Sequence, residues 1–368
     1  MVRILVEGMT KGKGGKEAYI YNTFKAFDRN EYSFSFIAYD DELAYEKELV
    51  QLGATIIHVP PRHRGLVAFR RAVKNLFVSE KYDVVWSHKT TLSSCEVLEY
   101  AKKYEVPMRI IHSHSSENMG GKMTYVLHSI NKKRISKWAT DFFACSEVAA
   151  KWFYTKESYS LMKNGIDVKK FQFDQKKRNQ VRKELGLGED FVIGHVGRFG
   201  VEKNHIKLLS VFKELLKKRN DAKLVLCGDG EERSNIEAFV RENDLTERVL
   251  LLGNINNVHE VLQAIDVFVM PSLFEGLPFA LLEAQASGLK CVVSDTVSKE
   301  SDVMGWNIFL PLSLSDEEWA ASILAVGNNH QREMAAAKLV NEGYDISDCA
   351  ERIMSLIETK REKSSGTR

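Results

Sequence analysis

The chain has 368 residues, of which 44% are hydrophobic and 28% charged, and this balance excludes a disordered protein. No apolar run approaches the roughly 20 residues that a membrane span needs. The first apolar stretch, VRILVE, leads straight into a glycine-rich loop, which does not resemble a signal peptide. The five cysteines form no CxxC motif, so we expect core thiols at Cys145, Cys227 and Cys291 and a cytoplasmic protein.

The net charge of +2 conceals an uneven distribution. Residues 1–165 contain 25 Lys and Arg against 18 Asp and Glu, a balance of +7, whereas residues 166–368 carry −5. A basic half joined to an acidic half indicates that the first half faces a negatively charged partner.

Strand-like and helix-like patterns alternate through the first half of the chain. Helical patterns lie near 16–27, 42–52, 66–79, 92–104 and 122–136. Between them come the apolar runs VRILVE, SFSFIAY, ATIIHV, DVVWS, MRIIHS and TDFFAC. This alternation predicts a doubly wound parallel sheet over residues 1–165.

The alternation weakens in the polar segment 166–189 and then resumes with FVIGHVG, AKLVLCG, RVLLLG, DVFVMP and KCVVSD. We therefore predict an α/β protein with two tandem Rossmann-like domains, 1–165 and 166–345, the second including a linker at its start. Residues 346–360 are predicted to form a last helix that packs back toward the N-terminal domain, and 361–368 a disordered polar tail. Ligands of such sheets bind beyond the carboxyl ends of the strands, so the loops that follow strands should carry the function.

The loop after the first strand is rich in glycine, with Gly8, Gly12, Gly14 and Gly15 ahead of a helix. Such a loop lets backbone N–H groups approach an anion at a helix N-terminus. It matches neither GxGxxG nor a Walker motif, so a tight turn and a ligand contact remain equally open.

Two histidines follow the apolar run MRIIHS. His112 and His114 lie on one face if the strand continues. We interpret one of them as an active-site group. Two alternatives are structural histidines and a zinc pair, for which no third ligand stands at a suitable spacing.

Two cations flank the loop that opens the second domain. Arg198 and Lys203 lie in GRFGVEKN, ahead of a helix that Asn204 is expected to cap. Two cations at a helix N-terminus suit a pyrophosphate, although either alone would suit a solvated turn.

Two carboxylates surround a further helix start in SLFEGLPFALLEAQASG. Glu275 precedes Pro278, and Glu283 lies a turn and a half into the helix. Carboxylates accept hydrogen bonds from vicinal hydroxyls, so the pair suits two sugar rings. Upstream, the loop GNINN can present backbone groups to a nucleobase.

Together these motifs resemble those of the retaining glycosyltransferases of family 4, whose GT-B fold has two Rossmann-like domains facing a cleft. The matching motifs span residues 1 to about 295 in family order: Gly14-Gly15, HSHS from His112, ACSE at 144–147, NGID at 164–167, GRFGVEKN at 197–204, CGDGEE at 227–232, and Glu275 with Glu283. Within the family, the chain is most similar to enzymes of bacterial capsule, exopolysaccharide or lipopolysaccharide synthesis.

The resemblance implies transfer of a hexose or related sugar from a nucleotide sugar, most commonly a UDP-sugar, to a hydroxyl of a lipid-linked glycan acceptor. His114, Arg198, Lys203 and Glu275 would be catalytic, with His88 and His112 on the acceptor side. Arg198 and Lys203 would bind diphosphate, Glu283 the ribose, and Glu275 the hexose. The donor-binding set would further include Gly14, Gly15, Gly197 and Asn254 and the backbone of Gly276, Leu277, Phe279 and Ala280. His112 competes with His114 for the role beside the reacting sugar.

No DxD motif stands in a strand-end loop, so we expect no metal and no cofactor. Arg198, Lys203 and the helix start would neutralise the leaving diphosphate. The family is thought to use a front-face reaction in which the departing phosphate helps to take the acceptor proton.

Two rival functions stay open. A nicotinamide-dependent oxidoreductase would need GxGxxG after a strand, which the chain lacks. A non-catalytic nucleotide-sugar-binding protein would keep the same motifs. We expect no nucleic acid partner for any of these functions.

The segment PRHRGLVAFRRAVKNLF at 61–77 interleaves cations with apolar residues. One interpretation is an ordinary surface helix on its own sheet. The other is a basic face that holds the enzyme peripherally on the anionic inner leaflet of the plasma membrane.

Overall fold

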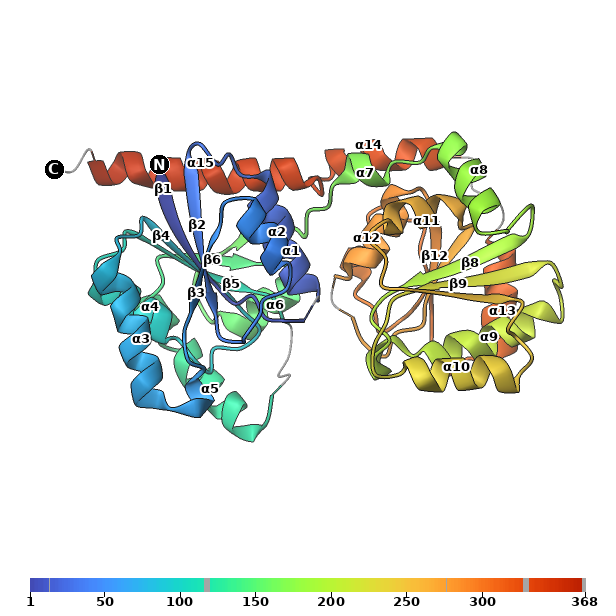
Figure 1. Cartoon of the computed structure of the whole chain (residues 1–368), viewed down its shortest axis with the longest axis horizontal. Coiled ribbons are helices and arrows are strands. Elements are labelled where there is room, and N and C mark those ends of the chain that lie inside the picture. The colour runs from blue at the N-terminus through green and yellow to red at the C-terminus, as the bar shows by residue number, and fades with distance from the viewer. Residues whose placement is uncertain (13, 116–119, 276, 327–330, 366–368) are drawn as a thin grey trace. The chain divides into compact units, whose positions relative to one another are not determined.

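The computed structural model describes residues 1–365, except for 13, 116–119, 276 and 327–330 (Figure 1). The chain divides into two compact units. The first comprises Met1–Gly165 and Ile346–Arg368, and the second comprises Ile166–Asp345. Each unit is built around its own parallel β-sheet, as the alternation of strand and helix patterns predicted.

The first unit contains a seven-stranded parallel sheet in the order β3-β2-β1-β4-β5-β6-β7. Apolar β-branched and aromatic residues dominate the central strands because both faces of the sheet are covered. The strands are β1 (Val2–Glu7), β2 (Tyr32–Ala38), β3 (Thr55–His58), β4 (Val84–Lys89), β5 (Met108–Ser113), β6 (Asp141–Ala144) and β7 (Ser160–Leu161).

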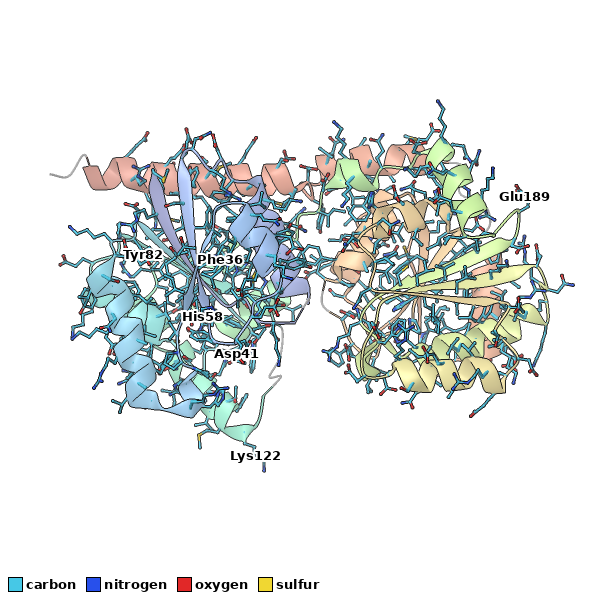
Figure 2. The ribbon with its side chains drawn as sticks, viewed as in Figure 1. Phe36, Asp41, His58, Tyr82, Lys122 and Glu189 are labelled. Atoms are coloured by element: carbon cyan, nitrogen blue, oxygen red, sulfur yellow. The ribbon has the colours of Figure 1, made fainter. Side chains whose placement is uncertain are left out.

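Helices cover both faces of this sheet. The helices are α1 (Gly15–Ala26), α2 (Glu46–Gln51), α3 (Leu66–Ser79), α4 (Glu96–Lys103), α5 (Lys122–Lys132), α6 (Glu147–Phe153) and α15 (Ile346–Ser365), with short 3₁₀ turns at Arg62–Arg64 and Ile135–Lys137. Apolar residues of α3, α4 and α6 share one core. Helices α1 and α15 pack on each other, and Phe36 of β2 points into the interior of this unit (Figure 2).

The second unit contains a six-stranded parallel sheet in the order β10-β9-β8-β11-β12-β13. Its strands are β8 (Phe191–Val196), β9 (Ala222–Cys227), β10 (Val249–Gly253), β11 (Val267–Met270), β12 (Lys290–Ser294) and β13 (Ile308–Leu310). Its helices are α7 (Val168–Phe171), α8 (Gln175–Glu184), α9 (His205–Leu216), α10 (Arg233–Glu242), α11 (Val258–Ala264), α12 (Phe279–Ala286), α13 (Asp316–Ala325) and α14 (Ala335–Asn341), and its 3₁₀ turns are η3 (Val201–Lys203), Lys299–Ser301 and Arg332–Met334.

The polar segment expected as a linker is largely helical and belongs to the second unit. Arg178 and Arg182 of α8 donate to backbone carbonyls between α11 and β11, and both pair with Asp266. These contacts therefore hold α8 against the end of α11 and the residue before β11, whereas the polar sequence predicted a linker.

The expectation of a disordered tail from residue 361 is wrong for its first part, because α15 continues to Ser365. The residues REK that follow Lys360 are good helix formers, so nothing in the sequence ends the helix there. Residues 366–368 lie outside the described part of the chain.

Helix α3 buries the apolar side that its sequence pattern displays. Phe69, Val73, Leu76 and Phe77 are buried. Arg62, just before the helix, pairs with Glu96 of α4 at 2.9 Å. This packing supports the interpretation of α3 as an ordinary surface helix.

Among the described residues, no helix combines the length and the apolar character that crossing a bilayer would require. All five cysteines are free thiols, and Cys95, Cys227, Cys291 and Cys349 are buried, whereas Cys145 is partly exposed.

Candidate active site

Three neighbouring strands of the second unit bring their loops together. Strands β8, β11 and β12 are adjacent and parallel, so their carboxyl ends share one edge of the sheet. The loop after β8 carries Arg198 and Lys203, and the loop after β11 carries Glu275. A backbone hydrogen bond from Leu273 to Glu202 (2.8 Å) ties these two loops to each other.

Lys203 and Glu275 form an ion pair at this edge. The Lys203 ammonium group donates to Glu275 Oε1, and only 14% and 17% of the two side chains are exposed. A partly buried pair of this kind is screened less by solvent than a surface pair. The structure therefore joins two residues that the sequence motifs assigned to different parts of a donor.

The backbone around Glu275 is held by the last residue of β12 and the loop that follows this strand. Glu275 bridges to Val297, and Ser298 N donates to Glu275 O at 3.1 Å. Ser294 and Thr296 donate to the carbonyl of Ser272. These bonds fix the backbone of the loop that carries Glu275.

Arg198 does not join Lys203 in this structure. Its guanidinium donates to Glu231 Oε2 at 2.8 Å, and 67% of the Arg198 side chain is exposed. Asn204 occupies the N-cap position of α9 with a left-handed backbone (φ 55°), but its side chain makes no capping hydrogen bond. The expected Asn204 cap is therefore wrong, because the side chain of a residue in this backbone region does not meet the first amides of the helix.

Gly197 lies where two loops and a side chain crowd together. A Cβ atom at Gly197 would lie 3.1 Å from Lys203 Cε and 3.2 Å from His195 Nε2. Gly228 has φ +146°, and a Cβ there would lie 1.9 Å from the carbonyl oxygen of Gly197. Only glycine fits at Gly228, and the two loops consequently pack backbone against backbone.

Two buried histidines lie beside Lys203 and were not singled out from the sequence. His195 Nδ1 bonds to Val269 O at 2.8 Å, and His195 Nε2 has no partner among the described residues. Burial, together with the nearby Lys203 charge, lowers the pKa of His205 to about 4. A polar residue within the apolar run FVIGHVG was the signal that could have identified His195.

Helix α12 begins at Phe279 after Pro278, and no side chain caps it within the described residues. Leu281 N bonds to Pro278 O at 3.1 Å, whereas the amides of Phe279 and Ala280 find no acceptor in the described part of the chain. The first amides of a helix attract anions. Leu277 precedes this helix start, and Gly276 lies outside the described residues.

Glu283 lies in the second turn of α12 and is partly buried. Burial raises the pKa of its carboxyl to about 7, and nearby Lys170 opposes the shift. Its carboxylate has no hydrogen-bond partner within the described residues. An acidic group left in such surroundings is suited to a ligand that donates hydrogen bonds.

Asn254 lies exposed after β10, the outer strand of the second sheet. Gly253 O accepts a hydrogen bond from Gly228 N (2.9 Å), which connects this loop to the loop of Gly228. The structure shows no side-chain contact between Asn254 and the Lys203–Glu275 pair.

The first unit brings three histidines together. His88 of β4 is paired in register with His112 of β5, and His114 follows the same strand. His88 Nδ1 and His114 Nε2 are 2.9 Å apart, and the Tyr19 ring of α1 lies 4.9 Å from the His112 ring in an edge-on contact. The cluster therefore lies between the strand ends and α1.

The three imidazoles are not equally accessible. His88 and His112 are buried, and neither ring nitrogen of His112 has a partner among the described residues. Burial lowers the pKa of His112 to about 3 and holds the pKa values of His88 and His114 well below the usual range. His114 is partly exposed, so it is the histidine that can meet a ligand directly.

His88 supplies the third imidazole that the sequence spacing did not reveal. One ligand nitrogen from each of the three histidines lies within 4.8 Å of the others, a separation that a transition metal could draw together. However, His88 and His114 already bond to each other, and the charge of Lys16 lowers the pKa of both. A neighbouring cation also opposes a divalent metal ion.

The glycine-rich loop leads into α1. Gly14 is its N-cap residue and Gly15 its first residue, and no side chain caps the helix within the described residues. Thr10 Oγ1 donates to Glu17 Oε1 at 2.8 Å, which closes the loop. At Gly8 (φ +118°), a Cβ would lie 2.1 Å from His88 O, so this glycine permits close packing against the histidine strand.

Two parallel-sheet units, with a cation–carboxylate pair and a helix start at one sheet edge, match the GT-B fold that the sequence motifs led us to expect. The family described as "Glycosyltransferase Family 4" matches residues 13–170, and "Glycosyl transferases group 1" matches residues 177–337. A Bacillus subtilis (strain 168) protein named "Putative glycosyltransferase EpsF" is 31% identical over 98% of this chain and 96% of its own. The chain belongs to glycosyltransferase family 4.

Two further similarities place the chain among known proteins. An Escherichia coli protein named UDP-Gal:alpha-D-GlcNAc-diphosphoundecaprenol alpha-1,3-galactosyltransferase is 32% identical over 60% of this chain and 59% of its own. The crystal structure of HepE from Anabaena in complex with UDP superposes with a TM-score of 0.78 at 16% identity, covering 98% of this chain and 100% of HepE. HepE has also been crystallised with UDP-glucose. At this identity, the HepE comparison shows the fold alone.

Proposed function

We propose that this enzyme is a retaining, metal-independent transferase of bacterial surface polysaccharide synthesis. It would move a hexose or related sugar from a UDP-sugar to a hydroxyl of a lipid-linked glycan. The observation that carries this proposal is the Lys203–Glu275 pair beside the uncapped start of α12. The names of the E. coli relative and of the HepE complexes support the UDP donor, and the E. coli name supports the lipid-linked acceptor.

Binding of the donor diphosphate would depend on the positive charge of Lys203 and on free backbone amides. Lys203 would exchange its contact with Glu275 for the diphosphate, whose oxygens would also accept from the amides of Phe279 and Ala280. Glu275, once released, would accept from hydroxyls of the hexose. Arg198, Gly197 and the neighbouring Gly276 would complete the diphosphate contacts.

The nucleoside end would be held by Glu283. An ionised carboxylate can accept hydrogen bonds from both ribose hydroxyls, and such bonds favour its charged form. The pKa of Glu283, near 7 without ligand, would therefore fall when UDP binds. The backbone around Asn254 would contact the base.

On the sugar side, His114 would act as a neutral hydrogen-bonding group. His88 holds Nε2 of His114, and this leaves its Nδ1 for a sugar hydroxyl. Burial holds the pKa of His114 well below its usual range and so favours the neutral imidazole, and acid–base chemistry would fall to the leaving phosphate. Gly14 and Gly15 would offer backbone amides from the start of α1.

The test is a panel of UDP-, GDP- and ADP-sugars, assayed by thermal stabilisation, donor hydrolysis and transfer to a soluble diphospho-lipid analogue. We expect a UDP-sugar to stabilise the protein and to be turned over, and the anomeric configuration of the product to match the donor. Stabilisation without turnover would indicate a binding protein. Binding of NADH in place of UDP would indicate an oxidoreductase.

A further inference from the structure

Helix α5 of the first unit turns apolar side chains outward. Met123, Val126 and Ile130, spaced three and four residues apart, have exposed fractions of 71%, 49% and 47%. This spacing puts them on one face of the helix. A surface hollow of about 450 Å³ lies on the same face, lined by Tyr125, Val126, Ser129, Ile130, Lys133 and Arg134.

Two polar side chains of α5 bond to the rest of the unit, and the Tyr125 ring also stacks on Trp152 with centroids 6.1 Å apart. His128 Nδ1 accepts from Leu92 N at 3.1 Å, and Asn131 Nδ2 donates to Leu92 O at 2.7 Å. The His128 ring stacks on Trp152 with centroids 4.0 Å apart. His128 and Asn131 of α5 therefore bond to the rest of the unit, whereas the apolar side chains of Met123, Val126 and Ile130 are exposed.

The charged side chains within the segment 120–140 have one sign, and Glu157 from outside the segment lies near Lys132. Residues 120–140 contain five cations, at positions 122, 132, 133, 134 and 137, and no Asp or Glu. Figure 2 shows the Lys122 side chain extending away from the ribbon at the start of α5. By contrast, the cations of α3 are partly neutralised by acids of α4: Arg70 lies 3.9 Å from Glu99.

We propose that the α5 face (Met123, Tyr125, Val126, Ile130, Lys133 and Arg134) docks the enzyme on an anionic lipid membrane. The apolar side chains would enter the interface between headgroups and acyl chains, and the cations would contact acidic headgroups. The expectation of a lipid rather than a protein surface rests on the proposed lipid-linked acceptor. A two-fold dimer through this face would also bring like charges together, which disfavours a second copy of the chain.

The test is co-sedimentation of the full chain with two kinds of vesicle, phosphatidylcholine alone and equal parts of phosphatidylcholine and phosphatidylglycerol. We expect binding to the anionic vesicles that weakens as salt is raised. Each cation at such a surface typically contributes about fivefold to partitioning. The variant K133A/R134A should therefore bind roughly 25-fold more weakly at low salt.

Two further variants complete the test. The first separates the contribution of the apolar side chains to vesicle binding from that of the cations, and the second separates the contribution of α5 from that of α3. V126S/I130S should lose the binding that survives high salt, and its unfolding midpoint should match wild type because both side chains are exposed. The matched control on α3, V67S/K74A, changes one exposed apolar residue and one exposed cation and should bind vesicles like wild type.

Several outcomes would overturn the proposal. These are equal loss of vesicle binding in the α3 control, equal binding to both lipids, absence of binding, or a wild-type dimer that the α5 variants dissociate. Donor hydrolysis is measured in parallel and should be unchanged in the α5 variants. Docking without any donor turnover would contradict the proposed function while leaving the membrane surface in place.

Discussion

Lys203 and Glu275 lie 72 positions apart in the sequence and form an ion pair that joins the loop after β8 to the loop before α12. The pair gives the enzyme without donor a neutral contact at the point where a diphosphate would bring negative charge. Donor binding would then be an exchange of partners for Lys203, from a carboxylate to a phosphate.

This exchange can be tested with a double-mutant cycle. Lys203→Ala should lower turnover by about 10²–10³-fold, since it removes one preorganised charge from the leaving group. Either single variant leaves a partly buried charge without its partner, so Lys203→Ala/Glu275→Ala should be more stable than the sum of the single effects. Thermal unfolding and steady-state kinetics measure the two effects, with Lys213→Ala of α9 as control. Wild-type turnover in Lys203→Ala would remove Lys203 from the diphosphate site.

Arg198 offers a second exchange of partners. Its exposed pair with Glu231 contributes little to folding, so Glu231→Ala should leave the unfolding midpoint unchanged and free Arg198 for a ligand. We expect tighter UDP binding by titration calorimetry in Glu231→Ala and weaker binding in Arg198→Ala. If both variants bind UDP like wild type, Arg198 does not contact the diphosphate.

Titrations with UDP and with the intact donor should distinguish the roles of Glu283 and Glu275. Glu283→Ala should weaken binding of UDP itself, because the proposed ribose contacts belong to the nucleotide. Glu275→Ala should keep or tighten UDP binding, because Lys203 loses its competing partner, yet it should reduce sugar transfer. Equal loss of UDP affinity in both variants would contradict this division of roles.

The raised pKa of Glu283 predicts a pH dependence of stability. The folded protein holds the proton to about pH 7, whereas an unperturbed glutamic acid releases it near 4.5. The folded state therefore binds more protons between these values, and its free energy of unfolding should fall as pH rises from about 4.5 to 7, by on the order of 2–3 kcal/mol. Denaturant unfolding across this range should show a smaller fall in Glu283→Gln. An identical pH profile in both proteins would place the Glu283 carboxyl in water.

Chelation tests the proposed independence from metal. Turnover should survive EDTA, because Lys203, Arg198 and the amides of α12 would neutralise the diphosphate. Loss of turnover on chelation, with recovery on adding Mn²⁺ or Mg²⁺, would contradict this. Recovery with Zn²⁺ that is abolished in His112→Phe would instead identify the histidine cluster as a metal centre.

The sequence by itself determined the two sheets and most of their order along the chain. Apolar runs of strand length, alternating with amphipathic segments, leave few ways to bury their side chains other than parallel sheets covered by helices. The same logic identified the loops with Lys203, Glu275 and His114, since strand ends in parallel sheets meet at one edge. Short and polar elements were less predictable. The sequence of α8 predicted a linker, because its contacts with the fold come from Arg178 and Arg182, which donate to backbone carbonyls more than 80 positions away.

Only the tertiary structure decided which side chains meet. No spacing pattern shows that Lys203 pairs with Glu275 while Arg198 turns to Glu231, because such contacts depend on the geometry of several loops at once. His88 joined His112 and His114 through the register of β4 against β5, which local sequence does not encode. Likewise, the sequence places apolar residues along both α3 and α5, but their burial depends on what each helix packs against. The fold buries the apolar face of α3 and leaves the apolar face of α5 exposed.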